Sequence, residues 1–435
     1  MTTPGNKFLA VLPFLAAYFL APAAVLAGRI AGQPEAFRPY GAQGLTPWLA
    51  LAGLALLVCL GRETFARTRQ DKPAWPGLVL GLLLAAAVLA GWRLFGPALA
   101  QAENLAPLLD ELRLPALALF AAAWAWSFGT PQRETLPHLG AALGGLVVLD
   151  FLLTAIMARQ VVLGGGYLLG AGQAGADTLA FLLAIALAAA LDRPGPDGPD
   201  RSGHRSSSLA RWLILAGIFA TFSRSGLAAA GVIILFLERG PLQERLALAC
   251  ACVLGIWMSL ALPLAKTLGG GEELGLAWHL TATLEALREV PRAWLTGLPL
   301  NEPVALAMPD LGGLDALGGL DALGGMSGLD VLGWDPESAG LPVYAFEMPS
   351  SWLRLLAAWG AGGPLLVLGW VLACALRGGR RFGLGLVAAM SVAAALTPAL
   401  HTPATAGVLA LACACAWQDA PAPETQPSDP PRETS

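Results

Sequence analysis

The stretch that decides the fold runs from Arg211 to Glu238 and reads RWLILAGIFATFSRSGLAAAGVIILFLE. Between its two end residues lie 26 residues whose only charged side chain is Arg224. A single helix through this stretch would put an arginine near the middle of a membrane, at a cost of roughly 2.5–3.5 kcal/mol on insertion scales. Twelve residues of helix rise only about 18 Å, against a hydrocarbon core of about 30 Å. We therefore predict two short helices that meet at Thr221–Gly226, with Arg224 at the floor of a cavity below the outer surface.

The composition of the whole chain is typical of a membrane protein. Of its 435 residues, 56% are hydrophobic and 13% are charged, whereas a soluble domain has about 25% charged residues. The net charge of -4 provides no general basic surface, so we expect no nucleic-acid partner. All six cysteines lie in apolar runs, which favours small hydrophobic residues over disulfides or metal ligands.

The hydrophobic pattern predicts an all-α, polytopic membrane protein with about 12 transmembrane helices. Residues 1–265 contain helices one to nine, 266–349 form a long periplasmic loop, 350–417 contain helices ten to twelve, and 418–435 form a disordered cytoplasmic tail. The predicted spans are Phe8–Ala27, Thr46–Leu60, Pro76–Trp92, Pro115–Phe128, Pro137–Ala158, Asp177–Leu191, Leu209–Phe222, Gly226–Leu237, Arg245–Ala265, Ser350–Leu376, Phe382–Pro398 and Thr402–Trp417.

Basic residues in the loops predict the orientation. They are concentrated in Arg62–Trp75, Asp192–Arg211 and Arg377–Arg381, and cytoplasmic loops carry an excess of lysine and arginine. These three loops fall on one side only if the chain breaks at Arg224, because a single helix there would send Arg377–Arg381 to the other side. We therefore expect a multi-pass protein of the bacterial inner membrane with both termini in the cytoplasm.

The long loop, Lys266–Pro349, is predicted to begin with a helix on the membrane surface. Within Leu274–Val290, leucines recur at positions 276, 280, 284 and 287, which is helical spacing. Such an amphipathic helix lies in the plane of the membrane interface and makes the bilayer lipids a partner of the chain.

Arg224 is the strongest candidate for a functional residue. Its guanidinium can hold a phosphate or pyrophosphate through two parallel hydrogen bonds. The alternative is a structural arginine that reaches the outer interface or pairs with Asp150 in the fifth span. Asp150 itself is then either this structural partner or a proton carrier.

Other candidates lie on the predicted outer side. Arg288 and Arg292 follow the surface helix, Arg354 begins the tenth span, and His401 lies in the last outer loop. The arginines are candidates for binding an anion, and the histidine can titrate near neutral pH. The chain has no P-loop, no zinc-protease motif and no dinucleotide-binding glycine pattern. We therefore expect neither a metal nor a cofactor.

Four segments, in this order along the chain, match motifs of one family of membrane proteins. They are Leu169–Gly172 with Asp177–Ala180, Thr221–Gly226 with its T-x-S-R pattern, Arg292–Gly297, and Pro349–Gly360 after the long loop. With the long loop between spans nine and ten, this layout resembles the O-antigen ligase and polymerase family, which includes bacterial O-linked oligosaccharyltransferases. The resemblance covers roughly Leu169–Leu376.

The resemblance implies a glycosyltransferase acting in polysaccharide biosynthesis on the periplasmic face. Members of that family transfer a glycan from undecaprenyl pyrophosphate to lipid A core, another glycan or a protein. The expected partners are therefore a polyprenyl-pyrophosphate-linked donor and one of these acceptors. The resemblance further implies that Arg224 contacts the pyrophosphate, and a fixed arginine there would stabilise the charge on the leaving group. A base would take the proton of the acceptor hydroxyl.

The chain departs from the family pattern at the residue expected to be this base. The family histidine aligns with Pro349, which cannot accept a proton, and the neighbouring asparagine aligns with Ser350. His279, Glu347 and His401 are the candidates to replace it. A member with a different acceptor and a member without activity both fit this departure.

Two other functions remain open on the sequence. One is a non-catalytic membrane partner in the assembly of envelope polysaccharide, which the missing histidine favours. The other is a polytopic transporter or flippase, which twelve spans would suit. Transporters usually have two similar halves, and the sequence lacks that internal symmetry.

Overall fold

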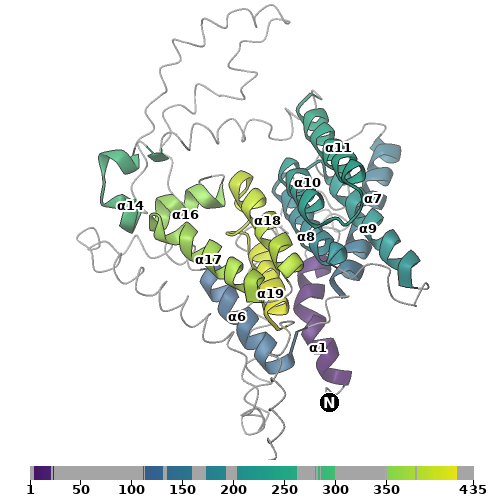
Figure 1. Ribbon diagram of the computed structural model, residues 1–435, viewed down its shortest axis with the longest axis horizontal. Helices are drawn as coiled ribbons and strands as arrows, with labels where there is room; N and C mark the ends of the chain where they lie inside the picture. Colours follow the sequence, from purple (N-terminus) through teal and green to yellow (C-terminus); the bar gives the residue numbers. More distant parts are fainter. Residues whose placement is uncertain are drawn as a thin grey trace, which may run out of the picture.

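A computed structural model of the chain describes residues 4–20, 23, 111, 113–130, 135–158, 173–192, 203–261, 280, 283–284, 286–298, 348, 350–377 and 380–418. Every regular element in these residues is a helix, which confirms the predicted all-α class (Figure 1). The predicted spans Thr46–Leu60 and Pro76–Trp92 lie outside the described residues, as do His279, Glu347 and most of the long loop.

The described helices follow the predicted spans closely in the rest of the chain. They are α1 (Pro4–Leu15), which continues as the π-helix η1 (Ala16–Leu20), α6 (Arg113–Phe128), α7 (Thr135–Ala158), α8 (Gln173–Leu191), α9 (Gly203–Thr221), α10 (Arg224–Leu237), α11 (Leu242–Ala261), α14 (Ala293–Thr296), α16 (Ser351–Trp359), α17 (Gly362–Arg377), α18 (Arg380–Leu396) and α19 (Pro403–Gln418). The separation of α9 from α10 confirms the predicted break at Thr221–Gly226.

The tenth predicted span, Ser350–Leu376, is wrong as a single helix. The chain forms α16 and α17 instead, with a break at Gly360, whose backbone has φ 64° and ψ -161°. This region of backbone space is open almost only to glycine. The break also exposes backbone groups that bond to another segment, since the amide of Ala361 donates to the carbonyl of Trp294 at 2.8 Å. The continuous hydrophobicity of this stretch predicted one helix, because hydrophobicity does not reveal a hydrogen-bond partner elsewhere in the chain.

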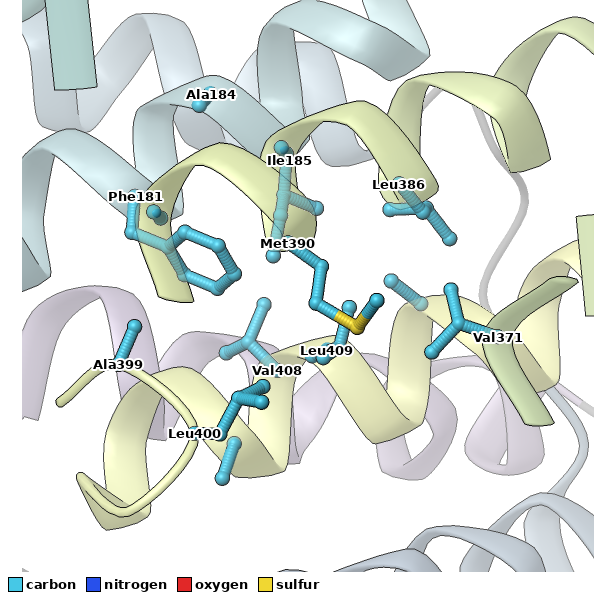
Figure 2. Packing of buried hydrophobic residues seen from close by; sticks show 14 of the residues in the cluster. Phe181, Ala184, Ile185, Val371, Leu386, Met390, Ala399, Leu400, Val408 and Leu409 are labelled. Atoms are coloured by element: carbon cyan, nitrogen blue, oxygen red, sulfur yellow. The ribbon is translucent and has the colours of Figure 1, made fainter. Parts of the chain in front are cut away.

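The centre of the bundle is built around α8, which is buried on all its faces from Thr178 to Ala189. Figure 2 shows Phe181 and Ile185 of this helix beside Met390 of α18, with Val408 and Leu409 of α19 on the other side. A helix that is apolar all round is typical of a core or of a membrane.

Small residues bring the neighbouring helices close together. Gly140 and Gly144 lie four residues apart on α7 and face α9 and α8. A methyl group at Gly217 of α9 would lie 2.6 Å from the Cα of Gly144, so no larger side chain fits between these two backbones. Close packing through small residues at this spacing is common where helices associate without a hydrophobic driving force.

The helices run in two opposite directions, and their contacts define two ends of the bundle. At one end Arg211 pairs with Glu238 at 2.8 Å, and Gly385 of α18 lies against Ala188 of α8 and Leu237 of α10. The connection from α17 to α18, with an arginine on each side, lies at the same end because Gly383 packs against Ala375. We call this the arginine end. The helices α6, α8, α10 and α19 begin at the opposite end, the cluster end.

Several outward faces of the bundle are apolar. Leu365 and Leu376 of α17 are 67% and 64% exposed, and Leu368 and Leu372 lie between them on the same side of the helix. Val253, Leu254 and Trp257 are exposed in the same way on α11. Among the described helices, one contains a segment, Thr135–Leu153 of α7, that is long and apolar enough by itself to cross a membrane, and eight shorter apolar helices accompany it.

Candidate functional site

The turn between α9 and α10 is held by a group of hydroxyls at the cluster end. Ser223 is the N-cap of α10, and its side chain accepts a hydrogen bond from the amide of Gly226 at 3.1 Å. The hydroxyl of Thr221 accepts from the amide of Ser223 at 3.2 Å and donates to the carbonyl of Ile218 at 2.7 Å. The sequence forms a sharp break here because a capping side chain satisfies an amide that the helix leaves free.

Asp177 of α8 fixes this turn to the centre of the bundle. Its Oδ1 accepts hydrogen bonds from the hydroxyls of Ser223 at 2.5 Å and Ser225 at 3.0 Å. Both serines are buried, so these bonds replace the water that their hydroxyls would otherwise need. We call Asp177, Thr221, Ser223, Arg224 and Ser225 the turn cluster. Sequence reasoning assigned no role to Asp177, although an acidic residue at the start of an apolar helix was a signal.

Phe222 has a strained backbone within this turn. Its φ of 52° is the only positive value at a non-glycine residue in the described part of the chain. Such a conformation costs on the order of 1–3 kcal/mol and persists where the surroundings fix it, often at functional sites. The ring of Phe222 packs against that of Phe151 in α7, with 5.8 Å between the ring centroids.

Arg224 is recessed relative to the end of α7. This helix continues from Phe151, beside the turn, to Ala158, which is seven residues further. At 1.5 Å per residue, the helix rises about 10 Å past the turn. Arg224 is partly buried as the first residue of α10. Asp150 is buried one position before Phe151 and therefore lies near the level of this turn.

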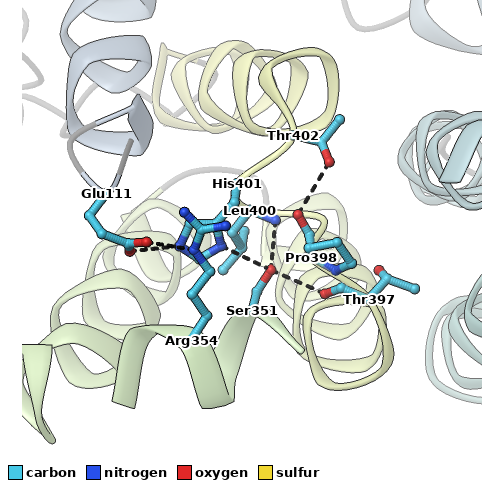
Figure 3. Close-up of polar contacts among 8 residues, drawn as sticks. All are labelled: Glu111, Ser351, Arg354, Thr397, Pro398, Leu400, His401 and Thr402. Atoms are coloured by element: carbon cyan, nitrogen blue, oxygen red, sulfur yellow. Dashed lines mark hydrogen bonds and ion pairs between the residues drawn. The ribbon is translucent and has the colours of Figure 1, made fainter. Parts of the chain in front are cut away.

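A second polar group lies at the same end and joins three elements that are far apart in sequence (Figure 3). Glu111, just before α6, contacts Arg354 of α16 with Oε1 at 2.5 Å from Nε. The other oxygen of Glu111 lies 3.1 Å from Nε2 of His401, between α18 and α19. Nδ1 of His401 lies 3.4 Å from the hydroxyl of Ser351. We call Glu111, Ser351, Arg354 and His401 the ion cluster.

The ion cluster lies at the cluster end because α16 is attached to the end of α18. The amide and the hydroxyl of Ser351 both donate to the carbonyl of Thr397, at 3.0 and 3.1 Å. The same hydroxyl accepts from the amide of Leu400 at 2.9 Å. Ser350 caps α16 and also donates to the carbonyl of Ala394 at 3.0 Å. These bonds place Arg354 and His401 on facing elements.

Burial and charge together determine the protonation of this cluster. Burial raises the pKa of Glu111, but His401 and Arg354 outweigh it, so the pKa lies below its usual value. Burial is also the largest influence on His401 and lowers its pKa, with Arg354 and Arg113 acting in the same direction against Glu111. The cluster is therefore an ionised carboxylate and guanidinium with a neutral imidazole, whose Nε2–H donates to Glu111.

This geometry favours a structural tie over a reacting group. Ser351 is fully buried and its oxygen already donates and accepts, so it is not placed as a nucleophile. Both ring nitrogens of His401 face groups of the cluster. Removing one partner from a buried ion pair costs about 3–5 kcal/mol, because the other charge stays buried.

The structure brings two of the predicted site residues together, Arg354 and His401. Arg224 lies in the turn cluster at the same end, and Arg288 and Arg292 are exposed on the segment that ends in α14. Glu111 and Ser351 were missed by sequence reasoning. Glu111 is 243 positions from Arg354, and no local pattern in a sequence marks a contact over that separation. No group of three or more potential metal ligands occurs among the described residues.

Comparison with known proteins adds no assignment. No protein-family model matches the chain, and no curated protein matches it significantly.

Proposed function

We propose that this chain lies in the bacterial inner membrane and binds the pyrophosphate of a polyprenyl-linked glycan in the turn cluster, from which the glycan passes to an acceptor on the periplasmic side. The observation that carries the proposal is the position of Arg224, at the head of α10 in a strained turn that lies about 10 Å below the end of α7.

The outward apolar faces support the membrane location. In a soluble bundle, the exposed side of each helix is polar. Here the exposed side of α17 carries a row of leucines from Leu365 to Leu376, and that of α11 carries Val253 and Trp257. Contiguous apolar surface on this scale favours lipid as the surrounding solvent.

The distribution of arginines supports the orientation. Arg211, Arg245 and the two arginines that flank the α17–α18 connection gather at one end of the bundle. Cytoplasmic ends of membrane helices carry such an excess of basic residues. The cluster end, with Arg224 and Arg354, then faces the periplasm.

The depth of Arg224 follows from helix lengths. From Arg211 to Thr221 there are ten residues, about 15 Å of helix, and from Arg224 to Glu238 there are fourteen, about 21 Å. If the Arg211–Glu238 pair marks the cytoplasmic boundary, the turn ends well short of the outer boundary of a core about 30 Å thick. A non-helical turn at this depth needs protein or water around it, and the hydroxyls of the turn cluster meet that need.

The chemistry of the turn cluster suits a diphosphate. The guanidinium of Arg224 can bind two phosphate oxygens at once, and the start of α10 adds the positive end of its helix dipole. In the transfer, the acceptor oxygen attacks the sugar carbon and the pyrophosphate leaves with the bonding electrons, so a fixed cation beside it lowers the barrier. His279 and Glu347 remain candidates for the base, since His401 is engaged in the ion cluster.

The test is transfer by the full chain in proteoliposomes, with a polyprenyl-pyrophosphate glycan in the membrane. We expect Arg224→Ala to lower the transfer rate by roughly 100-fold or more and Arg224→Lys to retain part of it, because lysine keeps the charge but not the two-pronged geometry. The matched control is Arg239→Ala, which removes an exposed arginine at the arginine end and should transfer at the parent rate.

Equal rates for Arg224→Ala and Arg239→Ala would contradict the proposal, provided that both variants unfold at the parent temperature. Loss of glycan assembly in cells without transfer by the purified chain would favour a non-catalytic partner. Movement of the donor between leaflets without transfer would favour a flippase.

A further inference from the structure

The segment Ala286–Leu298, which we call the α14 segment, is the longest described stretch of the long loop. Leu287, Ala293 and Leu298 are buried and join it to the core. The amide of Leu298 donates to the carbonyl of Ala357 at 2.6 Å, and the amide of Ala361 donates to the carbonyl of Trp294 at 2.8 Å. The segment is therefore fixed to the break between α16 and α17, as Figure 1 shows at the edge of the molecule.

Two glycines make this attachment close. Gly297 and Gly360 both have positive φ values, 79° and 64°. A methyl group at Gly360 would lie 2.6 Å from the carbonyl oxygen of Trp294, and one at Gly297 would overlap the carbonyl of Ala358. The α14 segment is thus held by backbone contacts, which fix the direction of its remaining side chains.

The exposed side chains of the segment are mostly apolar or basic, with Glu289 as the one acidic residue among them. Leu295 is 76% exposed, Val290 is 50% exposed and Trp294 is 40% exposed, although the segment is folded and packed. Arg288 and Arg292 are exposed within a few residues of them. Leucine and tryptophan beside arginine is the composition of a membrane-interface anchor.

The position of the segment extends the apolar surface of α17. Ala361, which bonds to Trp294, is one helical turn from Leu365, the first leucine of the exposed row on α17. This end of α17 packs on α16, since Gly363 contacts Leu355 and Trp359, and α16 begins at the cluster end. The α14 segment therefore lies beside the end of this apolar row that is farther from the arginine end.

We propose that the α14 segment is a membrane anchor. Trp294 and Leu295 insert into the outer leaflet, and Arg288 and Arg292 bind the phosphates of anionic phospholipids. Opposite charge selects the headgroup, and each arginine near an anionic surface strengthens binding by roughly fivefold. This inference rests on the proposed membrane location and does not depend on glycan transfer. It places both arginines on bilayer phospholipid and not on the glycan donor.

The test uses spin labels on single cysteines in the full chain. Exposed Cys250 is replaced by alanine, and background labelling of that parent is subtracted. Labels are placed by Leu295→Cys, Leu365→Cys and Arg239→Cys, and the chain is reconstituted in vesicles of phosphatidylethanolamine and phosphatidylglycerol. We expect the Leu295 label to collide several-fold more with oxygen than with an aqueous nickel complex, like the Leu365 label, whereas the Arg239 label favours the nickel complex.

The arginines are tested by repeating the Leu295 measurement with Arg288→Gln and Arg292→Gln, and in vesicles of phosphatidylcholine alone. The arginine substitutions and the change of lipid should each increase the collisions of the Leu295 label with the nickel complex. The collisions of the Leu365 label should stay unchanged. If the Leu295 label collides with the nickel complex as often as the Arg239 label does, while the Leu365 label still lies in the membrane, the α14 segment is not a membrane anchor. An aqueous Leu365 label would overturn the membrane location itself.

Discussion

His401 lies with its imidazole between a carboxylate and a hydroxyl, in a cluster whose four residues come from three distant parts of the chain. His401 and Arg354 together hold the pKa of Glu111 below its usual value, and burial lowers the pKa of His401. The neutral ring donates to the carboxylate, so the cluster carries no net charge although it contains three titratable or charged groups. Its stability then depends on the pH at which the ring takes up a proton.

Acid should destabilise the protein through His401 first. Because its folded pKa lies below the ordinary value of 6.5, the unfolded chain binds a proton below that pH while the folded chain does not. The free energy of unfolding is therefore highest above pH 6.5 and decreases as the pH falls, by at most about 1.4 kcal/mol per pH unit for one proton. The contribution of Glu111 is lost later, as the pH falls from the ordinary value of 4.5 toward its lower folded pKa.

The unfolding temperature of the purified chain, measured from about pH 7 to about pH 5, tests this. We expect His401→Asn to have a lower unfolding temperature at neutral pH and a flatter dependence on pH than the parent. His138→Asn, which removes an exposed histidine, is the matched control variant. A His401→Asn curve as steep as that of the parent would show that another group controls the acid response.

At the scale of elements, the break between α16 and α17 depends on two glycines that contact backbone. Gly297 and Gly360 combine positive φ with ψ values of 168° and -161°, a region almost closed to other residues. Gly129 also has a positive φ, 79°, but a methyl group there would meet nothing within 4 Å. An alanine at Gly129 would therefore meet only the cost of the positive φ, whereas one at Gly297 or Gly360 would also overlap backbone atoms.

We expect Gly129→Ala to lower the free energy of unfolding by about 1–2 kcal/mol, the usual cost of a left-handed residue. Gly297→Ala and Gly360→Ala should cost more, because the added methyl group also pushes the α14 segment away from α16. Chemical denaturation in detergent measures the three values. Equal losses in all three variants would mean that the α14 segment is not tightly attached to the bundle.

At the scale of the whole molecule, the arginines lie in two groups, one at each end of the bundle. The arginine end gathers Arg211, Arg245 and the connection between α17 and α18, and the cluster end gathers Arg224 with Arg354. Successive helices that reverse direction produce this arrangement, since every second connection lies on the same side. The membrane proposal assigns the arginine end to the cytoplasm.

Labelling of cysteines in intact cells tests this assignment with the same chain. We expect a membrane-impermeant thiol reagent to label Arg292→Cys, on the exposed α14 segment, and to reach Arg239→Cys only after the inner membrane is permeabilised. Both positions are exposed, so burial does not explain a difference between them. The reverse pattern of labelling would invert the topology and put Arg224 in a cavity that opens to the cytoplasm.

The break predicted at Arg224 and the single helix predicted through Ser350–Leu376 show where the sequence was sufficient and where it was not. A charged residue with a serine cap in a 26-residue apolar run predicts its own turn, because the cost of burying the charge and the means of capping the helix are both local. The split at Gly360 was not predicted because its reason is a hydrogen bond from Ala361 to Trp294, which lies 67 positions earlier in the chain.

The sequence by itself determined the all-helical class, most helix boundaries and the break at Arg224, since each follows from hydrophobic periodicity, capping and charge within one stretch. Only the tertiary structure decided that Glu111 joins Arg354 and His401, that Asp177 holds the serines beside Arg224, and that the α14 segment lies on α16. These contacts join residues that are tens to hundreds of positions apart. The sequence pattern indicates the local structural preference of each residue, but not which distant residue it contacts.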